Sequence, residues 1–362
     1  MEIRLLTGPL DEPWLGAIAD LYGRFNGKYG DPSFCRCLFN HNPSGYSLHA
    51  FLIHDSGQVV GHYGIIPMDI VVDGQRRRSG KCEAFVVHPD HRDATLAQKQ
   101  GGPITCGLAM PLHLYRHALE HGLEVVHMVA DAEVGLIHRM TGCRGLATRH
   151  RRAVLELRPV EVTLASLPAW KRAIRLMLGA GQRLAFGLSY AATLGWLGRV
   201  RCWSGAEVTS ERLARIAADI PPVTGWTLAI DSPTLAWMAR TGEVQVFALD
   251  DAMKNYAVAC GRAGHGDSME IIYWRQRSGG SRSALRLLGA VVRRARQLGK
   301  SAVAYSHGAA WHPSDLSGLR TAGRLLFFHE RAQHSGLYVR ASDPYYLDPK
   351  NLHFTPFFYA AF

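Results

Sequence analysis

Apolar runs of strand length alternate with longer amphipathic segments through the first 157 residues. Trp14, Ile18, Leu21, Tyr22 and Phe25 fall on one helical face, which predicts an amphipathic helix. Runs rich in apolar and β-branched residues, bounded by turn residues, predict strands. The expected helices are 11–27, 32–39, 108–121 and 134–140, and the expected strands are 2–6, 49–54, 58–72, 81–89, 125–131 and a last strand that carries Leu155 and Leu157.

The order of these elements is a strand, two helices, three strands, a helix, a strand, a helix and a strand. A chain of repeated βαβ units would alternate strictly between the two kinds of element, and this order does not. The pattern therefore predicts an α+β fold, in which a mixed β-sheet is flanked by helices.

The segment 159–240 has a different composition. It is rich in Leu, Ala, Arg and Trp and predicts helices, and its most apolar stretch is 184–197. That stretch is too short, and too often interrupted by glycine, to span a bilayer, which needs about 20 apolar residues. Because Lys and Arg residues at 171–183 precede it, one interpretation is a peripheral contact with a membrane surface. The other interpretation is a helical hairpin packed between domains.

The pattern of the first half returns in the third portion of the chain. Strands are expected at 243–250, 256–263, 269–274 and 301–307, helices at 279–299 and 316–322, and a closing hairpin at 325–340. Such an internal repeat of domain size predicts two similar domains. The expected parts are a first domain at 1–158, a helical linker or insert at 159–240, a second domain at 241–343 and an aromatic tail at 344–362 that packs on the body or lines a substrate groove.

Length and charge agree with this division and suggest partners. The chain has 362 residues, more than the roughly 250–300 at which a single core stops growing. Lys and Arg total 41 against 30 Asp and Glu, a net charge of +11. That excess favours anionic partners, such as nucleotide phosphates, an acidic carrier protein, tRNA or anionic lipid. A generally basic protein without a charged partner is the other interpretation.

The cysteines and the first residues bear on the compartment. Seven unpatterned cysteines indicate reduced thiols and not a disulfide framework, and residues 1–14 have no signal-peptide pattern, so we expect a cytoplasmic protein. Cys35 and Cys37 lack a second ligand pair at zinc spacing, and the 18 histidines form no HExxH motif. We therefore expect no metal. The basic run 149–152 has no interleaved aromatic residues, which argues against a nucleic-acid partner.

The segment from Glu83 to Arg92 combines an acidic residue, an alternating apolar strand and the pattern Val-x-Pro-x-x-Arg. It resembles the central strand of the GNAT superfamily of N-acetyltransferases. The segments 61–64 and 138–142 are similar to the flanking motifs of that family and occur in the same order. The resemblance covers 3–157, and 244–340 more weakly, and implies a tandem GNAT-like protein.

The resemblance implies transfer of an acyl group to an amine by direct attack, which needs a base for the amine and an acid for the leaving thiolate. It implies Glu83 as the base, with Asp131 as the alternative, and His138 as the acid. Glu270 is the counterpart of Glu83 in the second half, whereas Leu319 stands at the position that corresponds to His138. Glu83 also has a structural interpretation, a buried ion pair, and His138 that of a surface or core histidine.

Acetyl-CoA or a longer acyl-CoA is the implied co-substrate, and an acyl carrier protein is a second donor. The phosphates of such donors bind backbone amides in Gly-rich turns at helix N-termini. In the first half the glycines follow Arg92 only after a lengthened loop, whereas the second half keeps the pattern Gln-x-x-Gly-x-Ser. The residues expected to contact the donor are Val86, Val87, Arg92, Gln98, Gly101 and Gly102 in the first half, and Gln276, Arg277, Gly279, Gly280 and Ser281 in the second.

The sequence thus favours an acyltransferase that acts on the amine of a small-molecule acceptor. Each half lacks one part of the family's machinery, so a non-catalytic binding or scaffold protein is the first alternative. An aminoacyl-tRNA-dependent transferase is the second, because tandem GNAT-like folds serve that chemistry and the chain is basic. The acceptor, the acyl length, the oligomeric state and the reacting half stay open at this point.

Overall fold

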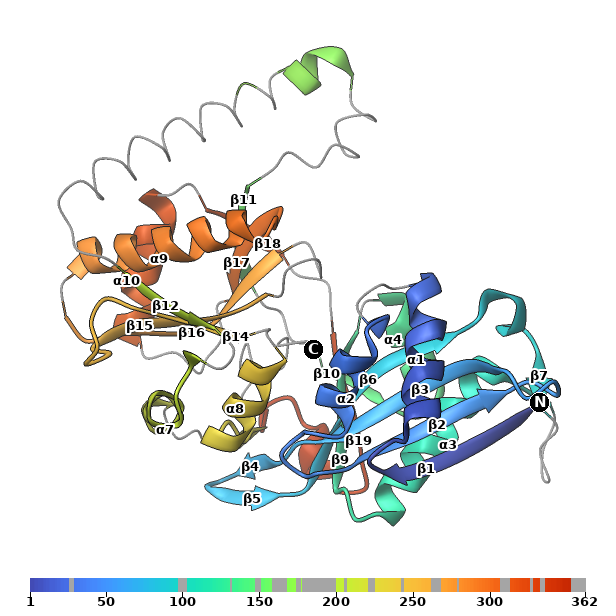
Figure 1. Cartoon of the computed structure of the whole chain (residues 1–362). Helices are drawn as coiled ribbons and strands as arrows, with labels where there is room; N and C mark the ends of the chain where they lie inside the picture. The colour runs from blue at the N-terminus through green and yellow to red at the C-terminus, as the bar shows by residue number, and fades with distance from the viewer. Residues whose placement is uncertain are drawn as a thin grey trace. The chain divides into compact units, whose positions relative to one another are not determined.

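The computed structural model divides the chain into two compact units (Figure 1). The first comprises Met1–Arg149, Leu213–Thr241 and His334–Phe362, and the second comprises His150–Arg212 and Gly242–Gln333. The structure describes residues 1–352 except 26–28, 97–102, 131, 147–150, 158–167, 174–176, 178–199, 205–206, 221–224, 242–243, 262–267, 279, 307–312, 326–327 and 333–335.

A seven-stranded sheet forms the centre of the first unit, with the order β1-β2-β3-β6-β9-β19-β10. All neighbours in it are antiparallel except β6 and β9, which are parallel. Its strands are β1 (Glu2–Gly8), β2 (Ser47–Ile53), β3 (Val59–Pro67), β6 (Ser79–Val87), β9 (Val125–Ala130), β10 (Arg144–Leu146) and β19 (Gly336–Ala341). Smaller sheets join β4 (Ile70–Val72), β5 (Gln75–Arg77) and β13 (Trp226–Leu228), and β7 (Thr95–Leu96) with β8 (Ile104–Thr105).

Helices cover both faces of this sheet. In Figure 1, α1 (Glu12–Phe25) and α2 (Pro32–Phe39) lie in front of it and α3 (Cys106–Glu120) lies behind it. α2 begins after Asp31 because the Asp31 side chain accepts a hydrogen bond from the Ser33 amide and Pro32 occupies the first turn. The remaining helical segments of this unit are α4 (Ala132–Met140), α8 (Ser232–Arg240) and the short 3-10 helices Pro89–His91 and Pro344–Leu347.

The second unit repeats the arrangement. Its sheet has the order β12-β14-β15-β16-β17-β11-β18, again with one parallel pair, β16 and β17, at the same place in the order. Its strands are β11 (Arg151–Glu156), β12 (Arg201–Ser204), β14 (Val244–Ala248), β15 (Asn255–Cys260), β16 (Ser268–Gln276), β17 (Ala302–Ser306) and β18 (His329–Ala332). α9 (Gly280–Gln297) and α10 (Pro313–Leu325) pack on it, and α7 (Ser210–Asp219) lies where the chain passes back to the first unit.

The two halves of the sequence exchange one strand. β11 follows the first half of the chain but lies between β17 and β18, and β19 follows the second half but lies between β9 and β10. The expectation that 155–157 closes the first sheet, and that 325–340 forms a hairpin, is therefore wrong. Apolar alternation identifies a strand and its buried face, but it does not identify the sheet that the strand joins.

The unit boundaries consequently differ from those expected. Residues 151–156 belong to the second unit, whereas residues 213–240 and 336–343 belong to the first. The expected helical insert at 159–240 also contains the strands β12 and β13, because alternating segments of only three or four residues give a weak strand signal. The apolar stretch 184–197 lies outside the described residues. Of the tail, Tyr346 is buried and its hydroxyl donates to Glu124.

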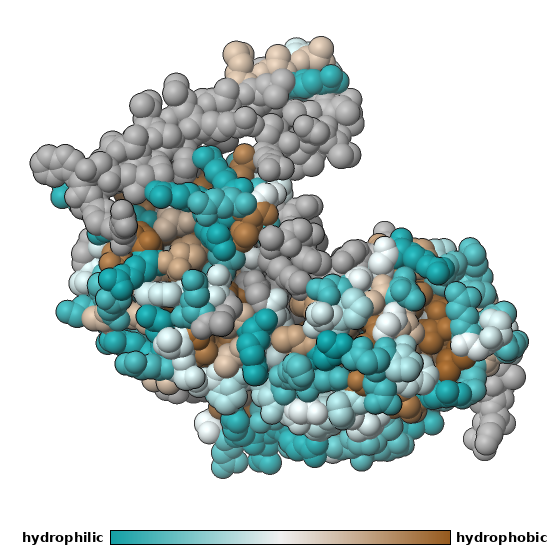
Figure 2. All heavy atoms as spheres, in the orientation of Figure 1, coloured by the Kyte–Doolittle hydropathy of each residue, from teal (hydrophilic) through white to brown (hydrophobic). Residues whose placement is uncertain are grey.

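Hydrophilic residues cover most of the visible face in Figure 2, and the hydrophobic residues there form small separate patches. None of the helices in the described ranges is both long and apolar enough to cross a membrane. Within the same ranges, no group of three or more His, Cys, Asp or Glu side chains is arranged to hold a metal ion.

Candidate active site

A β-bulge in β6 organises the first unit's site. Gly64 of β3 lies opposite Glu83, and His62 lies opposite Val86, so that Ala84 and Phe85 together face one residue of β3. Ala84 has a φ of 60°, in the left-handed region that L-residues other than Asn and Asp rarely adopt. A bulge of this kind adds a residue to one strand and bends it. Strained backbone of this sort is concentrated at functional sites.

The bulge places Glu83 and Phe85, two positions apart on β6, on opposite faces of the sheet. Cys82 and Phe85 pack with the core formed with α3, whereas Glu83 contacts Tyr29, which lies between α1 and α2. Without the extra residue, Glu83 and Phe85 would share a face, because side chains in a regular strand alternate. The bulge therefore gives β6 a carboxylate on the α1 side and an aromatic ring on the α3 side.

β6 and β9 pair over only part of their length. The pairing covers Ser79–Lys81 of β6 with Val125–His127 of β9, although β6 continues to Val87 and β9 to Ala130. The two parallel strands thus stop pairing just before Glu83. An extended ligand chain is the kind of group that pairs with the free edge of a strand. Val86 and Val87, two of the residues expected at the donor, lie on this segment of β6.

Lys81 and Tyr29 contact the Glu83 carboxylate. Its Oε2 lies 3.0 Å from Lys81 Nζ, and its Oε1 accepts a hydrogen bond of 2.8 Å from the Tyr29 hydroxyl. The side chain of Glu83 is 9% exposed and that of Lys81 4%. An ion pair of Glu83 was the structural interpretation of this residue, and Lys81 provides it. A carboxylate offers about four lone pairs, so Glu83 can accept several hydrogen bonds at once.

A pair of buried histidines lies beside Glu83 on the α1 face. His49 Nδ1 is 3.0 Å from His62 Nε2, and Ser47 Oγ is 2.8 Å from His49 Nε2. Both imidazoles are fully buried. Burial lowers the pKa of His49 to about 3 and holds the pKa of His62 well below its usual range. Both rings are therefore neutral at neutral pH, and they form a buried hydrogen-bonded pair.

His138 lies on the opposite face of the sheet. It is 2% exposed, its Nδ1 is 2.7 Å from the Tyr115 hydroxyl, and its ring lies 6.4 Å from that of Phe85. Burial lowers its pKa to about 4. The imidazole is therefore neutral at neutral pH, and the role of His138 as the acid for the thiolate stays a prediction. A neutral imidazole still donates a hydrogen bond from its protonated nitrogen.

The donor loop of the first unit differs from a simple Gly-rich turn. β7 and β8 form a short ladder before α3, and the Cys106 amide donates to the Ala94 carbonyl. Thr105 precedes α3 without capping it through its side chain, which leaves the next amides of the helix to other acceptors. Gln98, Gly101 and Gly102 lie outside the described residues, as does Asp131. Arg92 is exposed and donates to the Val87 carbonyl. The two nearby carboxylates contact other residues: Glu83 pairs with Lys81, and Asp90 lies beside His88.

The corresponding turn of the second unit uses its own amides internally. The amide of Gln276 donates to Asp315 Oδ1 at 2.9 Å, that of Arg277 to the Lys254 carbonyl at 3.2 Å, and that of Ser278 to Asn255 Oδ1 at 3.0 Å. The Gln276 carboxamide donates to the Gly280 carbonyl at 2.6 Å. Amides that already donate to protein acceptors are not available for phosphate without breaking those bonds. Ser281 lies in the first turn of α9, and Gly279 lies outside the described residues.

Asp315 holds α10 against the end of β16. Its Oδ2 lies 2.9 Å from Arg275, and the residue is 1% exposed. Gly318, one turn further along α10, lies against the Gln276 carboxamide, which would have to move to admit a Cβ there. Both β6 and β16 continue beyond the last pair with their parallel neighbours, but at the end of β16 Asp315 attaches α10 through Arg275 and the Gln276 amide.

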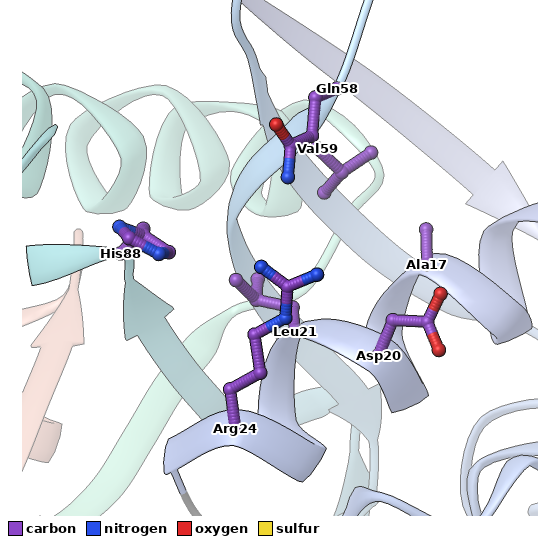
Figure 3. A pocket seen from close by; sticks show the side chains of 7 residues that line it. All are labelled: Ala17, Asp20, Leu21, Arg24, Gln58, Val59 and His88. Carbon is purple, nitrogen blue, oxygen red and sulfur yellow. The ribbon is translucent and has the colours of Figure 1, made fainter. Parts of the chain in front are cut away.

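A polar pocket of about 120 Å³ lies at the carboxyl end of β6 on the α1 side (Figure 3). Asp20 and Arg24, one turn apart on α1, line it together with Gln58 and His88. Neither Asp20 nor Arg24 forms an ion pair or hydrogen bond with any residue that the structure describes. The pocket contains neither Glu83 nor His138. It shares a face of the sheet with Glu83, and it offers a ligand both an anion and a cation.

Several features of this site carry no local sequence signal. Tyr29 contacts Glu83, and Tyr115 contacts His138, each from a different element of the fold. Lys81 contacts Glu83 from the same strand, at a position that matches no motif. Asp315 lies 39 residues from the amide that it binds. The short spacing of Lys81 and Glu83 on one strand was the one available signal, because residues two apart in a strand share a face.

No protein-family model matches the sequence, and no curated protein matches it. Among solved structures, a tandem GNAT protein from the clavulanic acid biosynthesis pathway aligns over 95% of this chain and 99% of its own, at 12% identity and a TM-score of 0.51. The chain has a tandem GNAT fold. The likeness to a protein of the same length confirms the fold that the sequence predicted.

Two further solved structures are similar to this chain. A GCN5-related N-acetyltransferase from Kribbella flavida aligns over 94% of this chain and 71% of its own, at 15% identity and a TM-score of 0.51. A probable N-acyltransferase from Enterococcus faecalis V583 covers 94% with 73% of its own, at 10% identity and a TM-score of 0.52. Identities this low establish the fold alone.

Proposed function

We propose that the chain is an N-acyltransferase whose first unit moves an acyl group from acyl-CoA, or from an acyl carrier protein, to the amine of a small molecule. The observation that carries the proposal is the buried Glu83 carboxylate at the bulge of β6, where pairing with β9 ends. The tandem GNAT fold supports the class of reaction. Acetyl-CoA or a longer acyl-CoA is the co-substrate.

The unpaired segment of β6 fits the donor's extended arm. Residues 83–87 lie beyond the last pair with β9, so an amide-containing chain has a strand edge to bind. The first turn of α3 would receive the phosphates, since Thr105 does not cap it. In the second unit, by contrast, the amides of Gln276, Arg277 and Ser278 are engaged. We therefore assign the reaction to the first unit.

In the proposed reaction the amine attacks the thioester carbonyl directly. A bond forms between nitrogen and the acyl carbon, the bond from carbon to sulfur breaks, and the electron pair leaves with sulfur. Glu83, whose carboxylate contacts Lys81 and Tyr29, accepts the proton that the amine loses. His138, neutral on the other face, donates a hydrogen bond to the sulfur. No covalent enzyme intermediate is needed.

The pocket at Asp20 and Arg24 is our candidate for recognising the acceptor. It lies on the face of the sheet that carries Glu83. Its two opposite charges suit a polar acceptor that bears both a carboxylate and an ammonium group. The free state of all seven cysteines supports a cytoplasmic location, where acyl-CoA is available.

Calorimetry and a thiol-release assay test the proposal together. The expected result is saturable binding of CoA and release of free thiol when an acyl-CoA and a suitable amine are both present. Absence of CoA binding and of turnover across acyl lengths and amines would favour the scaffold alternative. Steeply salt-dependent tRNA binding, with transfer only from aminoacyl-tRNA, would favour the tRNA-dependent alternative.

A further inference from the structure

Three buried side chains of the first unit form a continuous line of hydrogen bonds. The Tyr63 hydroxyl of β3 is 3.0 Å from the Tyr115 hydroxyl of α3, which is 2.7 Å from His138 Nδ1 of α4. Their exposed fractions are 1%, 0% and 2%. Met128 of β9 lies beside the line, with its sulfur 3.4 Å from the Tyr115 oxygen. Such a polar line inside an apolar core is costly unless each group is satisfied, so its arrangement is constrained.

The chemistry of the groups gives the line a direction. Burial lowers the pKa of His138 and raises the pKa values of Tyr63 and Tyr115 well above their usual range, so all three are neutral at neutral pH. A phenol is a stronger acid than a neutral imidazole N–H, and an imidazole nitrogen is a stronger base than a phenol oxygen. The Tyr115 hydroxyl therefore donates to His138 Nδ1. Tyr63 in turn donates to the Tyr115 oxygen.

This direction determines the tautomer of His138. When Nδ1 accepts a hydrogen bond, the one ring proton of a neutral imidazole lies on Nε2. Nε2 has no hydrogen-bond partner among the described residues, and it is not among the fully buried unpaired atoms. Its proton is therefore left to donate to a ligand. The ring centroid lies 6.4 Å from that of Phe85 on β6.

We propose that Tyr115 is a positioning residue that fixes His138 with its proton on Nε2, where it hydrogen-bonds the sulfur that leaves in acyl transfer. This inference rests on the proposed function. As the bond from carbon to sulfur breaks, the electron pair stays on sulfur, and the N–H of His138 stabilises it without giving up its proton. The thiolate takes a proton from solvent after release. Tyr115 and Tyr63 keep their own protons throughout.

The tautomer is measured directly in the full-length protein. Uniform labelling of the histidines with ¹⁵N, and comparison with a His138→Gln variant, assigns the two ring nitrogens of His138. The expected spectrum shows Nε2 protonated and Nδ1 unprotonated, and the Tyr115→Phe variant shows a mixture of tautomers. A proton on Nδ1 in the natural protein, or an unchanged tautomer in Tyr115→Phe, would overturn the proposal.

Kinetics separates positioning from a merely structural role. Tyr115→Phe is expected to lower kcat roughly 10-fold, the effect of one hydrogen bond, with KM for the donor unchanged. Glutamine at 138 presents an amide N–H without tautomers, so the same change in a His138→Gln background is expected to leave kcat nearly constant. Equal losses in both backgrounds would contradict the proposal.

The matched control is Tyr305→Phe, which removes a hydroxyl from a buried tyrosine of the second unit. Its kcat is expected to equal that of the natural protein. A protein that turns over no acyl-CoA at all would contradict the proposed function, while the tautomer measurement would still decide the assignment of Tyr115.

Discussion

Lys81 and Glu83 form an ion pair in which the ammonium nitrogen lies 3.0 Å from the carboxylate and both side chains are almost completely buried. The pair lies on one face of β6, immediately before the bulge at Ala84. A buried charge that loses its partner is costly, whereas a buried pair replaced by apolar groups often is not. Lys81 thus offsets the cost of burying the Glu83 carboxylate.

A double-mutant cycle tests this dependence. Lys81→Met is expected to lower the free energy of unfolding by about 3 kcal/mol, because it leaves the Glu83 carboxylate buried without its cation. The double variant Lys81→Met with Glu83→Leu is expected to recover part of that loss. Urea unfolding of the four proteins gives the coupling energy. Additive losses would show that the two residues do not stabilise one another.

Buried histidines predict a strong dependence of stability on pH. Burial lowers the pKa to about 3 for His49 and His127 and to about 4 for His138, against about 6.5 in the unfolded chain. The unfolded chain therefore binds protons first as the pH falls below about 6.5. Each of these histidines removes roughly 1.4 kcal/mol of stability per pH unit from there down to its folded pKa.

Unfolding by urea at pH 7 and at pH 5 measures this loss. The free energy of unfolding is expected to be several kcal/mol lower at pH 5. A His49→Gln variant removes one titrating ring and is expected to reduce the slope by about one proton. Equal stability at the two pH values would mean that these rings are not buried as neutral groups.

The contrast between the units predicts one donor site per chain. The amides of Gln276 and Ser278 are engaged, and Asp315 closes α10 over the end of β16, so the second unit is not expected to bind CoA. Titration of the full-length protein with CoA is expected to give a stoichiometry of one. Asp315→Ala is expected to destabilise the protein by about 3 kcal/mol without lowering that stoichiometry. Two equivalent sites would refute the contrast.

The pocket beside α1 predicts an effect on acceptor binding. Arg24→Gln removes its cation and is expected to raise KM for an acceptor with a carboxylate about 10-fold, with kcat little changed. The control is Arg215→Gln, which makes the same charge change on an exposed position of α7. Equal KM values for the two variants would place the acceptor elsewhere.

The local parts of the fold and site were predictable from the sequence. The alternation around Glu83 and the turn signals beside it identify β6, and the 3.6-residue spacing of Trp14, Ile18 and Leu21 identifies α1. These signals act over a few residues, within one element. The position of His138 on a helix was found in the same way, from a motif that covers five residues.

Features that depend on contacts between distant segments were not predictable in this way. The exchange of β11 and β19 is decided by which sheet each strand completes, and both strands have the same apolar alternation. The contact between Tyr115 and His138 has no local signal because the two residues are 23 positions apart and lie on different helices. Nothing near Asp315 in the sequence indicates that it binds the amide of Gln276.

The most direct test of the account compares two glutamates at equivalent places. Glu83 of β6 lies on the face away from α3, and Glu270 of β16 lies on the face away from α9, since its neighbours Met269 and Ile271 pack in the core with α9. The measurement is kcat for thiol release by Glu83→Gln and by Glu270→Gln, with circular dichroism to confirm that both are folded. The account predicts a loss of roughly 100-fold or more for Glu83→Gln and no loss for Glu270→Gln. Full activity in a folded Glu83→Gln protein, or a loss confined to Glu270→Gln, would contradict it.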